Sequence, residues 1–246
     1  MARDLEKLLS NLGYGSRTQV ARLLRDGAVT DAEGRPLGPK DSDPGGVLLV
    51  DGEPLDPRAP VVLVLHKPVG VVCSTSDPGA TVYSLLPPRF AARKPVIAPI
   101  GRLDKESSGL LLLTDDGALN HRLTSPKHHV EKRYEVILDR PLRGDEAAAF
   151  AAGGMLLDND DRPLLPARLL AKPGAASPAD GAGDTVCSVI LTEGRYHQVR
   201  RMFAAMGNHV LQLHRSAIGG LALPDDLPVG AWRPIRPDEA ALVPLA

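Results

Sequence analysis

The sequence predicts an α+β protein with two parts, a small amino-terminal domain over residues 1–58 and a larger domain over residues 61–246. We expect the larger domain to be built on a mostly antiparallel mixed β-sheet with flanking helices. Three observations predict this fold: helical spacing in a few short segments, many short apolar runs after residue 61, and no regular alternation of strand and helix. With 246 residues, 43% of them hydrophobic, the chain is long enough to bury a core.

Two short helices are predicted at the amino-terminal end. The first has apolar residues at positions i, i+3, i+4 and i+7, which are Leu5, Leu8, Leu9 and Leu12. Gly13-Tyr14-Gly15 ends this helix. The next helix begins at once, because Ser16 and Gln19 have the spacing of a capping box, and it ends at Asp26-Gly27.

Short strands complete the small domain. Val29 and the run Val47–Val50 are typical of strands, and segments rich in glycine and proline connect them. Residues 51–60 contain many Asp, Gly and Pro residues, which favour turns. We therefore expect the domain boundary near residues 56–60.

The larger domain is expected to consist mainly of strands. Its apolar runs are Val61–Leu65, Val69–Cys73, Leu110–Leu113, Tyr134–Leu138 and Val186–Leu191. The run Leu110–Leu113 is unbroken and is followed by a polar turn, which predicts a strand covered on both faces. Residues 172–183 contain little apolar bulk and many Gly, Pro and Ala residues, which is typical of a mobile surface loop.

One helix of the larger domain has a clear apolar stripe. Its members have the same i, i+3, i+4, i+7 spacing and are Val199, Met202, Phe203 and Met206. Gly207-Asn208 ends the helix. Arg200 and Arg201 lie near its start, where positive charge opposes the helix dipole. This arrangement indicates a negative partner, which is either a phosphate or a neighbouring Asp or Glu.

The net charge of −1 argues against a protein that binds nucleic acid through bulk positive charge. The charge is unevenly distributed, however. Residues 1–25 have five basic and two acidic groups, Arg3, Lys7, Arg17, Arg22 and Arg25 against Asp4 and Glu6. The small domain could therefore present a local basic surface, although an ordinary solvated helix has the same pattern.

Composition also predicts the compartment. No apolar run approaches the roughly 20 residues needed to cross a bilayer, and the first residues lack the apolar core of a signal peptide. We therefore expect a cytoplasmic protein with no membrane partner. Cys73 and Cys187 are isolated from each other, which predicts buried free thiols rather than a disulfide or a zinc site.

The segment Gly101–Leu111 places one carboxylate, Asp104, in a glycine-bounded loop immediately before the buried apolar run. Arg102 would lie on the same side of an extended segment, where it could keep Asp104 ionised when a substrate excludes water. An exposed Arg-Asp pair in an ordinary loop would give the same pattern.

Three motifs, in this order, resemble those of a known family. They are Gly101–Asp104 continued by Ser108–Gly117, then Glu131–Tyr134, and then Glu193–Met202. The family is that of the bacterial pseudouridine synthases that modify ribosomal RNA and carry an amino-terminal S4-type RNA-binding domain. Within it, several stretches are most similar to the members that form pseudouridine 516 of 16S ribosomal RNA. These stretches are residues 72–75, 123–129, 203–210, 213–215 and 218–220.

The resemblance implies the chemistry of the site. A pseudouridine synthase breaks the bond between ribose C1′ and uracil N1, turns the uracil within its pocket and joins C5 to C1′, and we expect no cofactor and no metal. By resemblance, Asp104 is the nucleophile that attacks C1′ or initiates loss of the 2′ proton. Tyr134 is expected to stack on the base and to accept the C5 proton, directly or through water. Arg200 is the expected salt-bridge partner of Asp104, and Arg102 is the competing candidate.

The resemblance also implies contacts with RNA. The residues expected to bind it are Arg102, Arg195, His197 and Arg201 in the larger domain and Arg17, Arg22 and Arg25 in the small S4-like domain. The expected partner is 16S ribosomal RNA, either free or within a partly assembled small subunit, and the expected oligomeric state is a monomer. Because the net charge is so small, we expect few phosphate contacts and a shallow salt dependence.

Two other functions fit part of the sequence. One is a synthase of the same family that acts on large-subunit (23S) ribosomal RNA. The other is an assembly factor that binds ribosomal RNA and keeps a catalytically silent fold, although intact Asp104, Tyr134 and Arg200 argue against it. A zinc or redox enzyme is disfavoured, because the histidines and cysteines lack the spacing of metal ligands.

Overall fold

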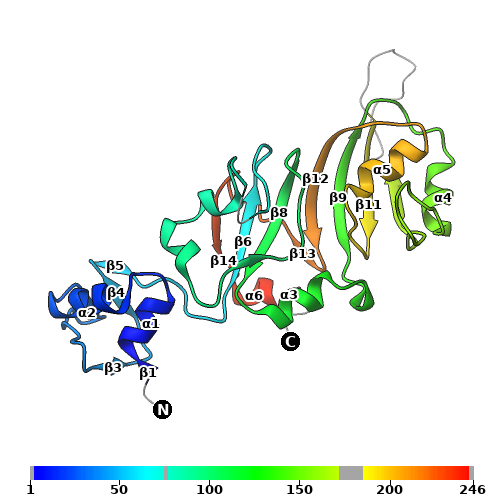
Figure 1. Cartoon of the computed structure of the whole chain (residues 1–246). Coiled ribbons are helices and arrows are strands. Elements are labelled where there is room, and N and C mark those ends of the chain that lie inside the picture. Colours follow the sequence, from blue (N-terminus) through cyan, green and yellow to red (C-terminus); the bar gives the residue numbers. More distant parts are fainter. Residues whose placement is uncertain (1–2, 75–76, 172–184, 244–246) are drawn as a thin grey trace. The chain divides into compact units, whose positions relative to one another are not determined.

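The computed structural model describes residues 3–74, 77–171 and 185–243, which form two compact units (Figure 1). The first unit lies within residues 1–62, 83–98 and 114–116, and the second within residues 63–82, 99–113 and 117–246. The segment 83–98 therefore packs with the amino-terminal part of the chain. The division into domains 1–58 and 61–246 remains a prediction, and the loop predicted at residues 172–183 lies outside the described residues.

The first unit begins with two helices, as predicted. They are α1 (Leu5–Asn11) and α2 (Arg17–Arg25). The Asp4 side chain caps α1 by accepting a hydrogen bond from the backbone of its first turn. Ser16 and Gln19 form the predicted capping box at the start of α2. Gly27 follows α2 with φ of 75°, a conformation that favours glycine, so this helix ends where the sequence indicates.

Two small sheets complete the amino-terminal part of this unit. The paired strands are β1 (Arg3–Asp4) with β3 (Ser42–Asp43), and β4 (Leu48–Val50) with both β2 (Val29–Asp31) and β5 (Glu53–Pro54). The apolar faces of the helices and strands form one core, whose buried members are Leu5, Leu9, Val20, Leu24, Val29, Leu37, Leu48 and Val50.

Two arginines fix the segment 83–98 within the first unit. This segment contains the short 3-10 helices η1 (Val82–Leu85) and η2 (Pro88–Ala92). Arg89 binds the carboxylate of Asp56 through two nitrogens. Arg93 is fully buried, lies 3.7 Å from the Asp115 carboxylate and donates a hydrogen bond of 2.7 Å to the carbonyl of Pro57. Charge-assisted contacts thus join three segments that are distant in sequence.

A large sheet forms the centre of the second unit. Over the described residues it has nine strands, seven of them in the order β10-β11-β9-β12-β8-β6-β14, while β13 pairs with β12 and β7 with β8. The strands are β6 (Val62–Lys67), β7 (Ala98–Pro99), β8 (Ser107–Thr114), β9 (Lys132–Leu138), β10 (Arg168–Ala171), β11 (Thr185–Leu191), β12 (Val210–Ile218), β13 (Leu221–Ala222) and β14 (Trp232–Pro234). Strands β12 and β8 are parallel, whereas β9 is antiparallel to both β11 and β12. The predicted mixed, mostly antiparallel sheet is confirmed.

Over the described residues, four α-helices accompany this sheet: α3 (Gly117–Thr124), α4 (Glu146–Ala152), α5 (Gln198–Ala205) and α6 (Pro237–Ala240). Helix α5 is the one predicted from the apolar stripe, and it contacts β12. Its residues Val199, Met202 and Phe203 are buried, whereas Met206 is the C-cap and is only half-buried.

Strands β8 and β12 approach each other closely at one glycine. Gly109 pairs with Arg215 and has φ of 111°, in the region that favours glycine. A Cβ atom at position 109 would lie 2.3 Å from the backbone oxygen of Arg215, which is far inside normal contact distance. The parallel register of β8 and β12 therefore depends on a residue without a side chain.

One predicted strand is missing from the structure, and several of the observed strands, of which β12 is the longest, were not predicted. The predicted strand Val69–Cys73 is not formed, because this stretch makes only the isolated bridge between Val72 and Thr81. Strand β12 was not predicted, since its outward-facing residues are largely polar and its two register irregularities break the alternation. The predicted strand Leu110–Leu113 lies within β8, and all four leucines are fully buried.

Two further predictions concern cysteines and membrane spans. Cys73 and Cys187 are both buried free thiols, as predicted. Among the described residues, no helix has the length and apolar character that crossing a bilayer requires.

Candidate active site

A pocket of about 330 Å³ opens in the second unit beside the Asp104 loop. Three parts of the chain form most of its lining, and Leu123 and Thr124 of α3 and Leu191 of β11 complete it. The Asp104 loop contributes residues 100–104. The strand wall consists of Ser107, Lys132, Tyr134, Leu213, Arg215 and Ile218, from β8, β9 and β12. The loop wall consists of residues 194–199, which lead into α5. The three sequence motifs therefore meet at one cavity.

Asp104 lies at the edge of this pocket, and its side chain is 25% exposed. Its backbone is fixed by Lys67, which is completely buried. The Lys67 ammonium donates hydrogen bonds to the carbonyls of Pro68, Asp104 and Ser107, at 3.0, 3.0 and 2.7 Å. Burial lowers the pKa of Lys67, while the three carbonyls satisfy all three of its N–H donors. Sequence reasoning missed this role, since nothing in the local pattern pairs residue 67 with residues 104 and 107.

Tyr134 and Lys132 reach the pocket from the same face of β9, because alternate residues of a strand point the same way. Tyr134 is 9% exposed and forms an inner part of the strand wall, as expected for a residue that contacts a base. Arg215 pairs with Tyr134 in the neighbouring strand β12, and its Nε donates to the carbonyl of Leu110 at 2.8 Å. The structure thus brings Asp104 and Tyr134 to one pocket, as predicted.

The strand wall carries positive charge that lacks a partner. Among the described residues, neither the Lys132 ammonium nor Nη2 of Arg215 has a hydrogen-bond partner, although both atoms are buried. Burial is the main cause that lowers the pKa of Lys132 from 10.5 to about 8, and the charge of Arg215 is the second. No carboxylate offsets these two effects on Lys132. No role was predicted for Arg215, because it lies in a strand that was not predicted, although residues 213–215 belong to the family resemblance.

His197 is the ion-pair partner that the structure gives to Asp104. Its Nε2 lies 3.5 Å from Oδ1 of Asp104, so the pair is ionic whenever the imidazole is protonated. The backbone of His197 is left-handed, with φ of 49°, which is uncommon for a residue other than glycine. Its ring stacks on that of Tyr196, with centroids 3.9 Å apart. The predicted contact of His197 with RNA phosphate stays a prediction, and the structure places its ring next to the Asp104 carboxylate.

Arg200 does not form the predicted salt bridge with Asp104. Its guanidinium donates to the carbonyl of Val210 at 2.8 Å and to that of Glu106 at 3.3 Å. Over the described part of the chain, the ion pairs of Asp104 include neither Arg200 nor the competing candidate Arg102. The prediction was wrong because Arg200 leaves α5 toward the backbone that follows Asp104, so it positions that segment rather than pairing with the carboxylate.

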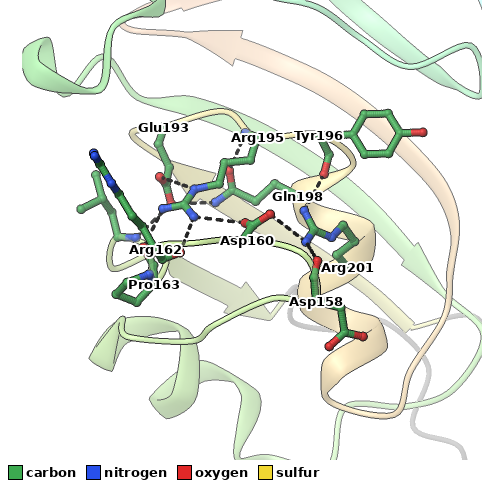
Figure 2. A network of polar contacts seen from close by, with 10 residues as sticks. Asp158, Asp160, Arg162, Pro163, Glu193, Arg195, Tyr196, Gln198 and Arg201 are labelled. Atoms are coloured by element: carbon green, nitrogen blue, oxygen red, sulfur yellow. Dashed lines mark hydrogen bonds and ion pairs between the residues drawn. The ribbon is translucent and has the colours of Figure 1, made fainter.

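Arg195 and Arg201 both bind Asp160 (Figure 2). The distances from their guanidinium nitrogens to its carboxylate are 3.1 and 2.9 Å. Arg195 also pairs with Glu193 at 3.1 Å, and Arg201 donates to the carbonyl of Tyr196 at 3.2 Å. Hydrogen bonds from Arg201 and then Arg195 lower the pKa of Asp160. The acidic neighbour considered for this helix is therefore present, and it occupies the two arginines that were expected to bind phosphate.

The other predicted RNA-binding arginines are exposed. Arg102 lies at the pocket, on the Asp104 loop. Arg17, Arg22 and Arg25 are exposed on α2 in the first unit, and Arg22 forms a solvent-exposed pair with Asp26 at 3.3 Å. Such exposed pairs contribute little to stability, so these side chains remain available to a ligand. Over the described residues, no group of three His, Cys, Asp or Glu side chains could hold a metal ion.

The fold and the site together define an RNA-modifying enzyme. Residues 61–205 match the RNA pseudouridylate synthase family, so the chain belongs to this family and is an RNA pseudouridine synthase. A crystal structure of a pseudouridylate synthase superimposes with a TM-score of 0.65 and 34% sequence identity, and the match covers 100% of both chains.

Several relatives have more specific names. The chain is 42% identical to the ribosomal small subunit pseudouridine synthase A of Yersinia pestis, over 97% of both chains. It is 44% identical to the protein of the same name from Escherichia coli, over 78% of both chains. An uncharacterized RNA pseudouridine synthase of Bacillus subtilis is 38% identical over 97% of both chains.

Proposed function

We propose that this chain converts one uridine of 16S ribosomal RNA, the position equivalent to 516 by resemblance, into pseudouridine. The observation that carries the proposal is the pocket in which Asp104, Tyr134 and the motif of residues 193–202 come together. The names of the small-subunit relatives, at 42% and 44% identity, support ribosomal RNA of the small subunit as the substrate.

In the proposed reaction Asp104 acts on the ribose. If a carboxylate oxygen attacks C1′, the C1′–N1 bond breaks and its electron pair moves onto the uracil, which becomes an anion. After the uracil turns, C5 attacks C1′ and the Asp104 carboxylate leaves. C5 then loses its proton while N1 gains one. In the alternative route Asp104 removes the proton on C2′, the electrons of the C2′–H bond form a C1′=C2′ double bond, and the uracil leaves with the electron pair of the C1′–N1 bond. After the uracil turns, C5 bonds to C1′ while C2′ takes the proton back from Asp104, and C5 then loses its proton as N1 gains one.

Tyr134 and the strand wall suit the base in this reaction. Tyr134 is 9% exposed and stacks on the uracil in the proposal, and its hydroxyl accepts the C5 proton directly or through water. The unpartnered charges of Lys132 and Arg215 favour the uracil when it becomes negative, since buried positive charge stabilises developing negative charge.

Binding to surrounding RNA must offset the cost of extruding the target base, which is a few kcal/mol. We propose that the amino-terminal unit contributes as an S4-type RNA-binding domain, with Arg17, Arg22 and Arg25 at phosphates. Their exposure on α2 supports this role. Arg195 and Arg201 are not part of the proposal, because Asp160 holds both.

The test is a map of pseudouridine in both ribosomal RNAs from a deletion strain that expresses either the wild-type chain or Asp104→Asn. Asparagine keeps the shape of the side chain but not its charge, so we expect one small-subunit position to be modified only with the wild type. Asp104→Asn should still bind RNA. If Asp104→Asn instead lacks a pseudouridine of large-subunit RNA, the substrate is large-subunit RNA and the proposal of 16S RNA is wrong.

Release of tritium from RNA that contains 5-tritiated uridine provides a second measurement. The wild-type chain should release tritium from small-subunit RNA or from a precursor particle, and comparison of the two identifies the natural substrate. If neither RNA releases tritium although both bind, the chain is an RNA-binding assembly factor and the proposed activity is excluded.

A further inference from the structure

Tyr196 differs from the other aromatic residues of this chain. The sequence contains three Phe, four Tyr and one Trp, and all eight lie within the described residues. Tyr196 is 74% exposed, whereas the other seven are buried or half-buried. A single exposed aromatic residue is ordinary on a protein surface, so exposure alone does not identify a binding site. What distinguishes Tyr196 is that its neighbours fix its ring and backbone beside the pocket.

The Tyr196 ring is held in one orientation by its neighbour. It stacks on the ring of His197, with centroids 3.9 Å apart and an angle of 14° between the planes. One face of the tyrosine is therefore covered, and the large exposed fraction leaves the other face open. His197 is left-handed, a conformation that persists in residues other than glycine where the surroundings hold it.

The backbone of Tyr196 is also fixed. Figure 2 shows a network around Asp160 that holds the loop wall from both sides, with the Tyr196 ring pointing away from it. Arg195 binds Asp160 and Glu193 before Tyr196, and Arg201 donates to the Tyr196 carbonyl at 3.2 Å after it. A ring that is already ordered loses little conformational entropy when a ligand binds to it.

Two tyrosines line the same pocket at different depths. Tyr134 is 9% exposed and belongs to the strand wall, whereas Tyr196 is 74% exposed and belongs to the loop wall. Asp104 also lines this pocket and pairs with His197, and the Tyr196 ring stacks on the His197 ring. A nucleoside that enters the pocket meets Tyr134, and the next part of the RNA meets the open face of Tyr196.

We propose that Tyr196 is a stacking platform for the unpaired base next to the target uridine in the RNA. This inference rests on the proposed function and adds a contact outside the reacting nucleotide. When the target base is extruded, one face of the adjacent base loses its stacking partner. The open face of Tyr196 replaces that partner, which recovers part of the cost of extrusion.

Binding of RNA to the full chain tests the proposal, with Asp104→Asn as the background so that no turnover occurs. The RNA is a small-subunit transcript or a precursor particle, each assayed in parallel for tritium release by the wild-type chain, and its affinity is measured by titration at fixed salt. Tyr196→Ala should weaken binding about tenfold, as expected for loss of one base–aromatic stack. Tyr196→Phe should bind normally, because stacking does not need the hydroxyl. Tyr196→Leu, which keeps apolar bulk without a ring, should bind like Tyr196→Ala.

RNA with an abasic nucleotide on one side or the other of the target uridine completes a double-mutant cycle. An abasic site on the stacked side should weaken binding to the chain that keeps Tyr196 and have no further effect on Tyr196→Ala. Equal losses for both proteins, or normal binding by Tyr196→Ala, would overturn the proposal. Failure of the proposed function is recognised separately, because the wild-type chain would then release no tritium from this RNA.

Discussion

The loop wall and the strand wall of the pocket differ in whether their cationic side chains have partners within the protein. On the loop wall, Arg195 pairs with Asp160 and Glu193, and Arg201 pairs with Asp160 from the helix that follows. On the strand wall, neither the Lys132 ammonium nor Nη2 of Arg215 has a partner among the described residues. The arginines at the loop wall are already paired in the absence of RNA, whereas the strand wall contains buried positive charge that a ligand can neutralise.

This difference changes which basic residues are expected to act on the substrate. Arg195 and Arg201 were expected to bind phosphate, but in the structure they hold a loop in place. Among the described residues of the strand wall, buried cationic nitrogens without a partner belong to Lys132, which lies within the motif Glu131–Tyr134, and to Arg215, which lies in an unpredicted strand. A largely buried cation that already pairs with a carboxylate is not available to a ligand, whereas an exposed pair can exchange partners.

The largest expected effect comes from the buried lysine that has partners. Lys67→Met removes the donor to three carbonyls, including that of Asp104, and leaves them unsatisfied. We expect a loss of roughly 3–5 kcal/mol in the free energy of unfolding. Denaturant titration measures it. Lys105→Met, at an exposed lysine next to Asp104, is the matched control and should change stability by less than about 0.5 kcal/mol. Equal effects of the two variants would contradict the role given to Lys67.

A smaller effect is expected when the loop wall loses its acid. Asp160→Ala removes the carboxylate that Arg195 and Arg201 share, so the free energy of unfolding should fall, by less than in Lys67→Met. Turnover should fall as well, because His197 and Asp104 would no longer be held in register. The exposed neighbour Asp161 provides the control, and Asp161→Ala should behave like the wild type in thermal melts and in tritium release. Unchanged stability of Asp160→Ala would show that the network is not needed to hold the loop.

The smallest effect, with the opposite sign, is expected on the strand wall. Lys132→Met removes a buried charge without a partner, so stability at pH 7 should increase by roughly 1 kcal/mol. Burial lowers the pKa of Lys132 to about 8 in the folded chain, below its ordinary value of 10.5. The unfolded chain therefore binds more protons between pH 8 and 10.5, and wild-type stability gains a contribution from Lys132 as the pH rises through that range.

Comparison of the two chains across this pH range isolates the lysine. The contribution should be absent in Lys132→Met, so the stability difference between the variant and the wild type should shrink above pH 8. Denaturant titrations at pH 7, 8.5 and 10 measure it. A variant that is less stable than the wild type at pH 7 would mean that the ammonium has a stabilising partner.

Periodic segments of the fold were predictable from the sequence, and irregular ones were not. The helices α1, α2 and α5 have apolar stripes and clear end signals, so their positions follow from local chemistry. The run Val69–Cys73 has the composition of a strand, but apolar residues can also be buried from an irregular segment. Strand β12 is held by its neighbours β8 and β9 rather than by its own pattern.

The candidate site divides in the same way. Asp104 and Tyr134 could be identified because each belongs to a short motif of consecutive residues. The partners of Arg195, Arg200 and Arg201 could not, since Asp160 is 35 and 41 positions away from two of them and Glu106 is 94 positions from the third. Charge spacing along one helix cannot tell a distant aspartate from a phosphate.

A substitution at Gly109 should abolish activity without changing any side chain that is proposed to react. Even a single methyl group there would act as a wedge between β8 and β12, since its carbon would overlap the Arg215 backbone at 2.3 Å. Strand β8 follows the loop that contains Asp104, and β12 contains the buried guanidinium of Arg215. Separation of β8 and β12 would displace the Asp104 loop and Arg215 together. Gly109→Ala should therefore lose turnover although every side chain proposed to act in the reaction is still present.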